Sequence, residues 1–129
     1  MEIKTKSIYE PKDKSDGTRI LVSRYYPRGV KKSHFDVWVR HASPEIPLLK
    51  AYKNGSIDWD ELSWKFKEQL RSSEESKAAI DQLIDLVESK GIVTLLCFER
   101  EGQNCHRDIV KAFMEIKIKR KTRKTTTNP

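Results

Sequence analysis

Runs of apolar residues along the chain predict three strands. Residues 2–8 alternate polar and apolar side chains, as a half-buried strand does. Residues 19–23 (Arg-Ile-Leu-Val-Ser) and 92–98 (Ile-Val-Thr-Leu-Leu-Cys-Phe) are short apolar runs, which is typical of buried strands. The pattern at residues 35–40 fits either a strand or a helical turn, and the sequence does not decide between them.

Between the second and third of these strands, the apolar residues follow the helical period instead. Three helices are expected there, at about 43–53, 58–71 and 73–89, each preceded by a residue that can cap its first turn. A last helix is expected from about Asn104, with its apolar residues on one face. Gly91 ends the helical block just before the third strand.

This order of elements predicts an α/β fold: a small, mainly parallel sheet with a helical crossover block, in a three-layer, Rossmann-like arrangement. If strands 19–23 and 92–98 are parallel neighbours, their carboxyl ends share one edge of the sheet. Ligands of open α/β sheets bind outside that edge. The loops concerned are 24–29 and 97–107. An antiparallel pairing would place these two loops at opposite ends.

The chain has 129 residues and 15.1 kDa, which suits one domain, and we assign residues 1–116 to it. No apolar run approaches the roughly 20 residues that span a bilayer. The first residues lack the apolar core of a secretory signal, and the chain has only two cysteines. We therefore expect a cytoplasmic protein without a membrane partner.

The net charge of +7 comes mainly from the end of the chain. Residues 117–124 hold six of the 26 basic residues, and no acid follows Glu115. Residues 117–129 are therefore predicted to be a basic, disordered C-terminal tail. Such a tail can make weak contacts with nucleic acid through counterion release. The alternative is a solvated helix end with no partner.

The chemically richest stretch follows the third predicted strand and contains Cys97 and Cys105-His106-Arg107. With Asn104 as the helix cap, the last three lie in the first helical turn. A helix N-terminus binds anions and lowers the pKa of a thiol. Cys105 is thus a candidate nucleophile or redox thiol, His106 a candidate proton carrier and Cys97 a second candidate thiol.

The loop after the second predicted strand adds two more arginines. Arg24, Arg28 and Arg107 could hold a phosphate or carboxylate through bidentate hydrogen bonds, with Tyr25 beside them as a stacking surface. The expected partner is a phosphate-bearing small molecule. The structural alternatives remain open: Cys97 as a core residue, Cys105 and His106 as an ordinary helix start, and arginines that pair with nearby acids.

Several sharper motifs are absent from the sequence. Gln103 stands where a Cys-x5-Arg phosphatase loop starting at Cys97 needs arginine. The cysteines and histidines do not match a zinc-binding spacing known to us, so no metal site is predicted. Neither a Walker loop nor Gly-x-Gly-x-x-Gly occurs, and the cofactor is unknown. A transient disulfide between Cys97 and Cys105 would amount to redox chemistry.

Residues 24–29 (Arg-Tyr-Tyr-Pro-Arg-Gly) resemble the Pro-Arg-Gly loop of the domain-of-unknown-function family numbered 488. Cys97 with residues 105–107 resembles a Cys…Cys-His-Arg signature of part of that family. Its middle region is similar to Trp38, Ser43-Pro44, Leu49 and residues 66–70. The resemblance covers residues 3 to about 115.

The resemblance implies a small cytosolic α/β domain. It also implies that six residues form one site: Arg24, Arg28, Cys97, Cys105, His106 and Arg107. It supplies no substrate, because the family's activity is not established. The chain departs from many members at Ser23 and Tyr26, where they carry Asp and Trp. Three functions therefore compete: an anion or nucleotide site with thiol-dependent chemistry, a nucleic-acid module acting through the tail, and a non-enzymatic interaction domain.

Overall fold

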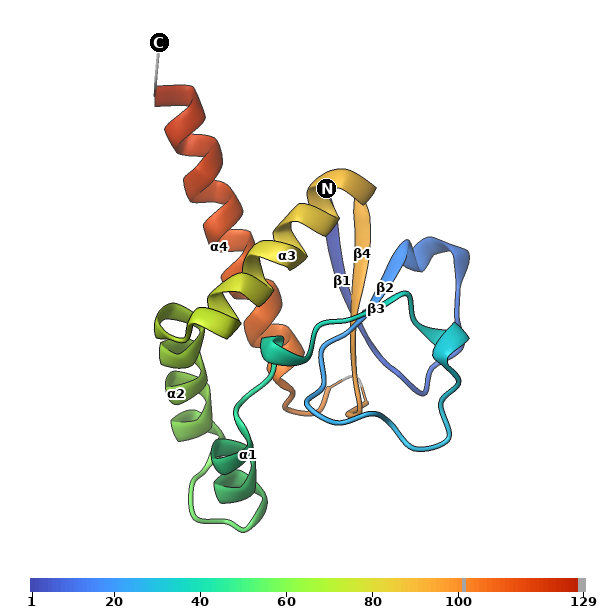
Figure 1. Ribbon diagram of the computed structural model, residues 1–129, viewed down its shortest axis with the longest axis vertical. Helices are drawn as coiled ribbons and strands as arrows, with labels where there is room; N and C mark the ends of the chain where they lie inside the picture. Colours follow the sequence, from blue (N-terminus) through green and yellow to red (C-terminus); the bar gives the residue numbers. More distant parts are fainter. Residues whose placement is uncertain (101, 128–129) are drawn as a thin grey trace.

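Four parallel strands form one sheet in the computed structural model, which describes residues 1–100 and 102–127 (Figure 1). The sheet order is β1-β4-β2-β3. The strands are β1 (Glu2–Ser7), β2 (Thr18–Leu21), β3 (Val37–Trp38) and β4 (Ile92–Cys97). The predicted parallel pairing of the second and third strand segments is confirmed, with Ile20 opposite Leu95. The segment at 35–40, which the sequence left undecided, contributes the two residues of β3 at the sheet edge.

The helices are α1 (Ile46–Lys53), α2 (Trp59–Ser72), α3 (Glu74–Lys90) and α4 (His106–Thr127). The predicted caps of α2 and α3 are confirmed: Asp58 accepts a hydrogen bond from the Glu61 amide at 2.9 Å, and Ser73 accepts one from the Ser76 amide at 3.4 Å. Helix α1 starts later than predicted, because the Ser43 hydroxyl bonds back to the Arg40 carbonyl instead of capping the helix.

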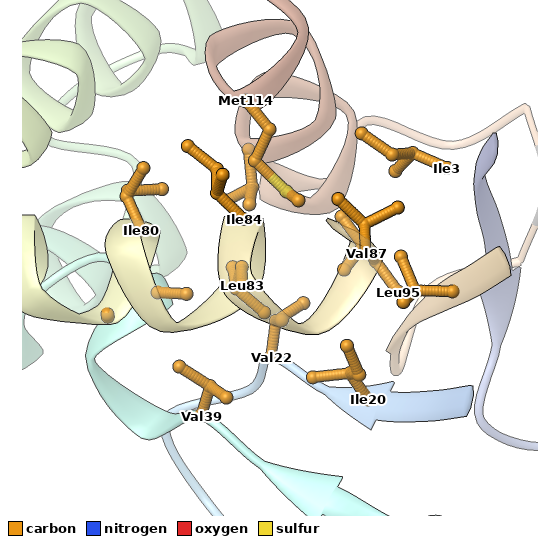
Figure 2. Close-up of a cluster of buried hydrophobic side chains, with 14 of the residues drawn as sticks. Ile3, Ile20, Val22, Val39, Ile80, Leu83, Ile84, Val87, Leu95 and Met114 are labelled. Carbon is orange, nitrogen blue, oxygen red and sulfur yellow. The ribbon is translucent and has the colours of Figure 1, made fainter. Parts of the chain in front are cut away.

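The main core lies between one face of the sheet and helices α2, α3 and α4. Figure 2 shows Leu83 and Val87 of α3 facing Ile20 and Leu95 of the sheet, with Met114 of α4 closing the cluster. All of these side chains are buried, since strands β2 and β4 direct alternate residues to this face. The helical crossover that the sequence predicted therefore covers one face of the sheet.

The opposite face has a smaller core of Ile8, Leu21 and Leu96. Loop and edge residues cover it, namely Val30, Phe35, Trp38 and Phe98. The α/β class and the parallel sheet are as predicted. The layer on this second face, however, is built of loops and short 3-10 turns, where a Rossmann-like arrangement has helices.

A buried ion pair lies under the same second face. Arg19 of β2 is fully buried, and its guanidinium is paired with the carboxylate of Asp16. Lys6 adds a second cation at 3.2 Å from Asp16, and the Arg19 Nε donates to the carbonyl of His34 at 2.8 Å. The Thr94 hydroxyl donates to the main-chain carbonyl of Asp16 at 2.7 Å. These contacts tie β1, β2 and β4 to the turn before β2.

Helix α4 is longer than the sequence predicted. It continues to Thr127, so the basic stretch after residue 116 is helical here, whereas the prediction was a disordered tail; residues 128–129 lie outside the described part. Its far half extends beyond the other elements (Figure 1). Lys117 is paired with Asp81 of α3 at 2.8 Å, and Ile118 packs against the main core. The division of the chain into a body and a separate tail stays a prediction.

None of the helices within the described ranges is both long and apolar enough to cross a lipid bilayer.

Candidate functional site

The carboxyl ends of β2 and β4 lie side by side, as the sequence predicted. Leu21 is opposite Leu96, and the Val22 amide continues the pairing by donating to the Leu96 carbonyl at 3.0 Å. On the other side of β4, the Ile8 amide donates to the Cys97 carbonyl at 2.7 Å. The segments that follow β1, β2 and β4 therefore leave the sheet at one common edge, where open α/β folds hold their ligands.

Both cysteines and a histidine come together behind this edge. Cys97 is the last residue of β4, Cys105 directly precedes α4, and His106 is the first residue of α4. The two sulfurs and a His106 ring nitrogen lie within 4.8 Å of one another. The exposed fractions are 1% for Cys97, 2% for Cys105 and 8% for His106. The grouping that the sequence proposed for these three residues is thus present, and it is shielded from solvent.

The His106 ring is held in one orientation. Its Nε2 lies 2.5 Å from the main-chain carbonyl oxygen of Val22, just after β2. A carbonyl only accepts hydrogen bonds, so Nε2 carries a proton, and in the neutral ring Nδ1 carries the lone pair. Nδ1 lies 3.7 Å from Cys97 Sγ and 3.9 Å from Cys105 Sγ, and Cys97 Sγ is also 3.8 Å from Nε2. The Phe66 ring packs against the imidazole in a T-shaped arrangement, with 5.9 Å between ring centroids.

Glu99 is a further member of the cluster, one that the sequence pattern did not single out. Its carboxylate accepts a hydrogen bond from the Cys97 thiol at 3.2 Å, and its side chain is half-buried. Burial acts to raise the pKa of Glu99, but hydrogen bonds from Cys97 and Cys105 outweigh it and hold the pKa below its usual value. The sequence feature that could have identified Glu99 is its position, two residues after Cys97 at the carboxyl edge of the sheet.

The pKa of the Cys105 thiol is shifted in the direction opposite to the one that the sequence predicts. Its contact with the Cys97 thiol, together with burial, raises the pKa of Cys105 far above its ordinary value, although His106 acts to lower it. From the sequence, the start of a helix is expected to lower this pKa. Desolvation and the neighbouring thiol outweigh that effect here. Burial by itself lowers the pKa of His106, but its contacts with Cys105 and the Val22 carbonyl raise it overall.

Arg107 is buried and engaged with the main chain. Its guanidinium donates to the carbonyl of Glu99 at 2.6 Å and to that of Arg100 at 3.1 Å. Its Nε has no hydrogen-bond partner in the described part of the chain. Arg107 therefore holds the segment that returns the chain from β4 to α4.

Arg24 also binds main-chain carbonyls. Its guanidinium donates to the carbonyls of Ser43 at 2.8 Å and Pro44 at 3.2 Å. Arg28 and Tyr25 are exposed on the same loop. The contacts in the described residues do not join the three arginines into one clamp, so their anion-binding role stays a prediction.

A hollow of about 570 Å³ lies on the other side of the same edge. Among the described residues, its lining includes two lysines, Lys12 and Lys31, and no acid. Its remaining lining comes from the ends of β1 and of the arginine loop, including Ile8, Tyr9, Gly29 and His34. Because the Ile8 amide bonds to the Cys97 carbonyl, the hollow and the cysteine cluster adjoin the same strand end.

The fold and site define a small parallel α/β protein with a buried Cys-Cys-His cluster at the carboxyl edge of its sheet. The chain belongs to the DUF488 family: the family model DUF488-N3a, described as "Active DUF488-N3 subclade", matches residues 3–117. The resemblance drawn from the sequence is thereby confirmed. The match includes the cluster and ends within α4.

Two relatives among curated proteins are themselves uncharacterised. The chain is 30% identical over 106 residues to YeaO of Escherichia coli (strain K12), covering 81% of this chain and 90% of YeaO. It is 26% identical over 114 residues to Rv3073c of Mycobacterium tuberculosis (strain ATCC 25618 / H37Rv), covering 87% of this chain and 92% of that protein. No solved structure matches this chain at a significant level.

Proposed function

We propose that this protein binds a phosphate-bearing small molecule at the carboxyl edge of its sheet and acts on it through chemistry that depends on Cys97, Cys105 and His106. The observation that carries the proposal is the convergence of these three side chains behind that edge. They come from two segments that are separated in sequence, and a cluster of titratable side chains with shifted pKa values is a candidate functional site.

The hollow on the other side of the edge supports the anionic character of the ligand. Lys12 and Lys31 line it without an opposing acid, and the exposed Arg28 is adjacent in sequence to the lining residue Gly29. A phosphate group would gain charge-assisted hydrogen bonds from these cations. Arg24 and Arg107 act indirectly in this proposal, because their guanidinium groups hold main-chain carbonyls of the neighbouring segments.

The proposal includes a cytoplasmic location. Both cysteines are free, although their sulfurs lie within 4.8 Å of each other. Thiols that must remain reduced suit a reducing compartment. The nucleic-acid alternative is not better supported, because Lys117 and Lys121 of the predicted tail are paired with acids of α3.

Thermal unfolding of the full chain tests ligand binding. The probes are inorganic phosphate, AMP, ATP and ribose 5-phosphate, with adenosine as the uncharged comparison. A probe present at about 100 times its Kd should stabilise the fold by about 2.7 kcal/mol and raise the Tm by several degrees. Arg28→Ala combined with Lys31→Ala should remove the shift.

Lys90→Ala is the matched control, because Lys90 ends α3 just before β4 and so lies at the amino edge of the sheet. It should leave the shift unchanged. If none of the phosphate compounds raises the Tm, or if the shift persists in the double variant, the ligand site is not the one proposed. Once a ligand is found, its turnover should be lost in Cys105→Ala while binding remains.

A further inference from the structure

The cysteine cluster has the donors and the spacing of a metal site. A tetrahedral zinc ion has bonds of about 2.3 Å to sulfur and about 2.0 Å to imidazole nitrogen, so its ligands are about 3.5 Å (sulfur to nitrogen) and 3.8 Å (sulfur to sulfur) apart. Here the Nδ1 of His106 is 3.7 Å from one sulfur and 3.9 Å from the other. All three donor atoms lie within 4.8 Å of one another. Rotation of the Cys97 side chain toward Nδ1 would be needed to bring all three donors onto one ion.

The hydrogen bond on the far side of the imidazole gives a second, independent indication. Metal-ligating histidines usually donate their other ring N–H to a carboxylate or a main-chain carbonyl, which fixes the tautomer and the ring orientation. The Nε2 of His106 is 2.5 Å from the carbonyl oxygen of Val22, which places the lone pair of the neutral ring on Nδ1. The sulfur of Cys97 is 3.7 Å from Nδ1 and 3.8 Å from Nε2, so its side chain has to turn toward Nδ1 for both to bind one ion.

We infer that Cys97, Cys105 and His106 form a binding site for Zn²⁺, with two sulfurs and Nδ1 as ligands and a fourth position on the side of Glu99. Thiolate and imidazole ligands select zinc over Mg²⁺ and Ca²⁺, which prefer oxygen. The Glu99 carboxylate lies 3.2 Å from the Cys97 sulfur, within reach of that fourth position. Two cysteines and one histidine with an open fourth position is the ligand set of a catalytic zinc site.

Each thiol releases its proton to solvent when its sulfur binds the ion, and His106 binds through a neutral nitrogen. Two protons therefore leave for each zinc bound. The sequence alone predicts no metal, because the spacing matches no motif known to us. Cys105 and His106 are adjacent in sequence, and the third ligand comes from the end of a strand eight residues earlier in the chain.

The inference rests on the geometry of the cluster and is independent of phosphate binding, so the two can fail separately. The full chain is stripped of metal with a chelator under reducing conditions and then titrated with Co²⁺. We expect about one equivalent to bind with thiolate-to-cobalt charge-transfer absorption and tetrahedral visible bands, and Zn²⁺ to displace it. Zinc should also raise the Tm, whereas Mg²⁺ should not.

Variants locate the ion. Cys105→Ala and His106→Gln should each weaken zinc binding by more than about 100-fold, and Glu99→Gln by about 10-fold. His41→Ala is the matched control, since His41 is partly exposed and paired with Glu75, and it should bind normally. Far-UV circular dichroism identifies variants that remain folded, and the titration of the unmodified chain tests the inference even where a variant does not fold.

Three outcomes are distinct. A folded, fully reduced chain that binds no Co²⁺ or Zn²⁺ overturns the metal site and leaves the proposed phosphate site standing. Binding that is undiminished in both Cys105→Ala and His106→Gln also overturns it, because the ion then lies elsewhere. Metal binding that is normal in a protein with no response to phosphate compounds supports the inference and contradicts the ligand proposal.

Discussion

At the scale of single residues, Cys105 combines a place beside a helix start with nearly complete burial, and the two features act on its thiol in opposite directions. The helix terminus favours a thiolate. Burial and the adjacent Cys97 thiol favour the protonated form and raise the pKa of Cys105. We therefore expect the Cys105 thiol to be protonated at neutral pH in the metal-free protein. A metal ion would reverse this preference, since a coordinating thiol is deprotonated.

Alkylation of the metal-free protein tests the state of this thiol. Between pH 6 and 9, Cys105 should react with iodoacetamide at least about 10-fold more slowly in the folded chain than in urea, because it is both buried and protonated. Peptide mass spectrometry reads the rate of each cysteine. A folded-state rate at pH 7 above that of an unfolded thiol would show that Cys105 is an activated thiolate after all.

Asp16 and Arg19 form a buried ion pair that is separate from the cysteine cluster. The carboxylate and the guanidinium are each almost fully buried, and Lys6 provides a further cation for Asp16. Replacing one partner leaves the other charge without compensation in the interior. We expect Asp16→Asn to lower the free energy of unfolding by about 3 kcal/mol or more. Urea denaturation at pH 7 measures it, with Asp85→Asn on the exposed side of α3 as the control.

The same carboxylate gives a pH dependence with a defined sign. Burial acts to raise the pKa of Asp16, but hydrogen bonds from the Asp13 amide, Lys6 and Arg19 outweigh it and lower the pKa below its ordinary value. A lowered folded-state pKa contributes stability above the unfolded pKa of about 3.9, and this is lost as the pH falls toward the folded value. The difference between the original chain and Asp16→Asn should therefore shrink below about pH 4. A constant difference down to pH 3 would contradict the shift.

At the scale of elements, Gly17 sets how closely β2 can begin beside β4. It has a φ of 63°, and a Cβ at this position would lie 2.3 Å from the carbonyl oxygen of Ile92, the first residue of β4. The contact is with main-chain atoms, which cannot rotate away as a side chain can. Any side chain at Gly17 therefore forces the two strand starts apart.

Alanine substitutions at Gly17 and Gly55 separate the cost of this contact from the cost of a positive φ alone. Gly55 has a φ of 82°, and a Cβ there would have nothing within 4 Å of it, so Gly55→Ala should cost about 1 kcal/mol. Gly17→Ala adds the overlap with Ile92 and should cost about 3 kcal/mol or more. Urea denaturation of both variants gives the difference. Equal losses would mean that β2 and β4 are not packed as closely as the structure has them.

The sequence predicted most elements because each carries a local signal. Strand β4 is a continuous apolar run, and α2 and α3 have both helical periodicity and a cap, at Asp58 and Ser73. The partners of Arg24 and Glu99 could not be predicted, because each depends on a segment that is distant in sequence or on the path of an irregular loop. Nor could the sequence predict that Arg24 and Arg107 bind main-chain carbonyls while Arg28 is exposed.

At the scale of the whole molecule, the two sheet faces differ in what covers them. Helices cover the face that carries the cysteine cluster, and loops cover the face that carries the Asp16–Arg19 pair and the cationic hollow. Loops tolerate sequence change better than packed helices do. The cluster thus has a rigid support, while the proposed ligand hollow is built from segments that can vary.

The final turns of α4 extend from this body, and we expect the fold to tolerate their removal. After Ile118, which packs on the main core, residues 119–123 are exposed, and Lys121 is paired with Glu88 on the surface. Deleting residues 120–129 removes four cations, including Lys121 with its exposed pairing to Glu88. The free energy of unfolding should fall by less than about 1 kcal/mol, because exposed pairs contribute little.

Any affinity for duplex DNA at low salt should fall in the same variant, since each lost phosphate contact lowers the salt dependence of binding. Fluorescence anisotropy at 50 and 200 mM salt measures it. Deletion from residue 117 is the comparison: it also removes Ile118 and the Lys117–Asp81 pair, and should cost more stability. DNA affinity that survives both deletions would refute a tail contact, and a large loss of stability in the shorter deletion would mean that the end of α4 supports the fold.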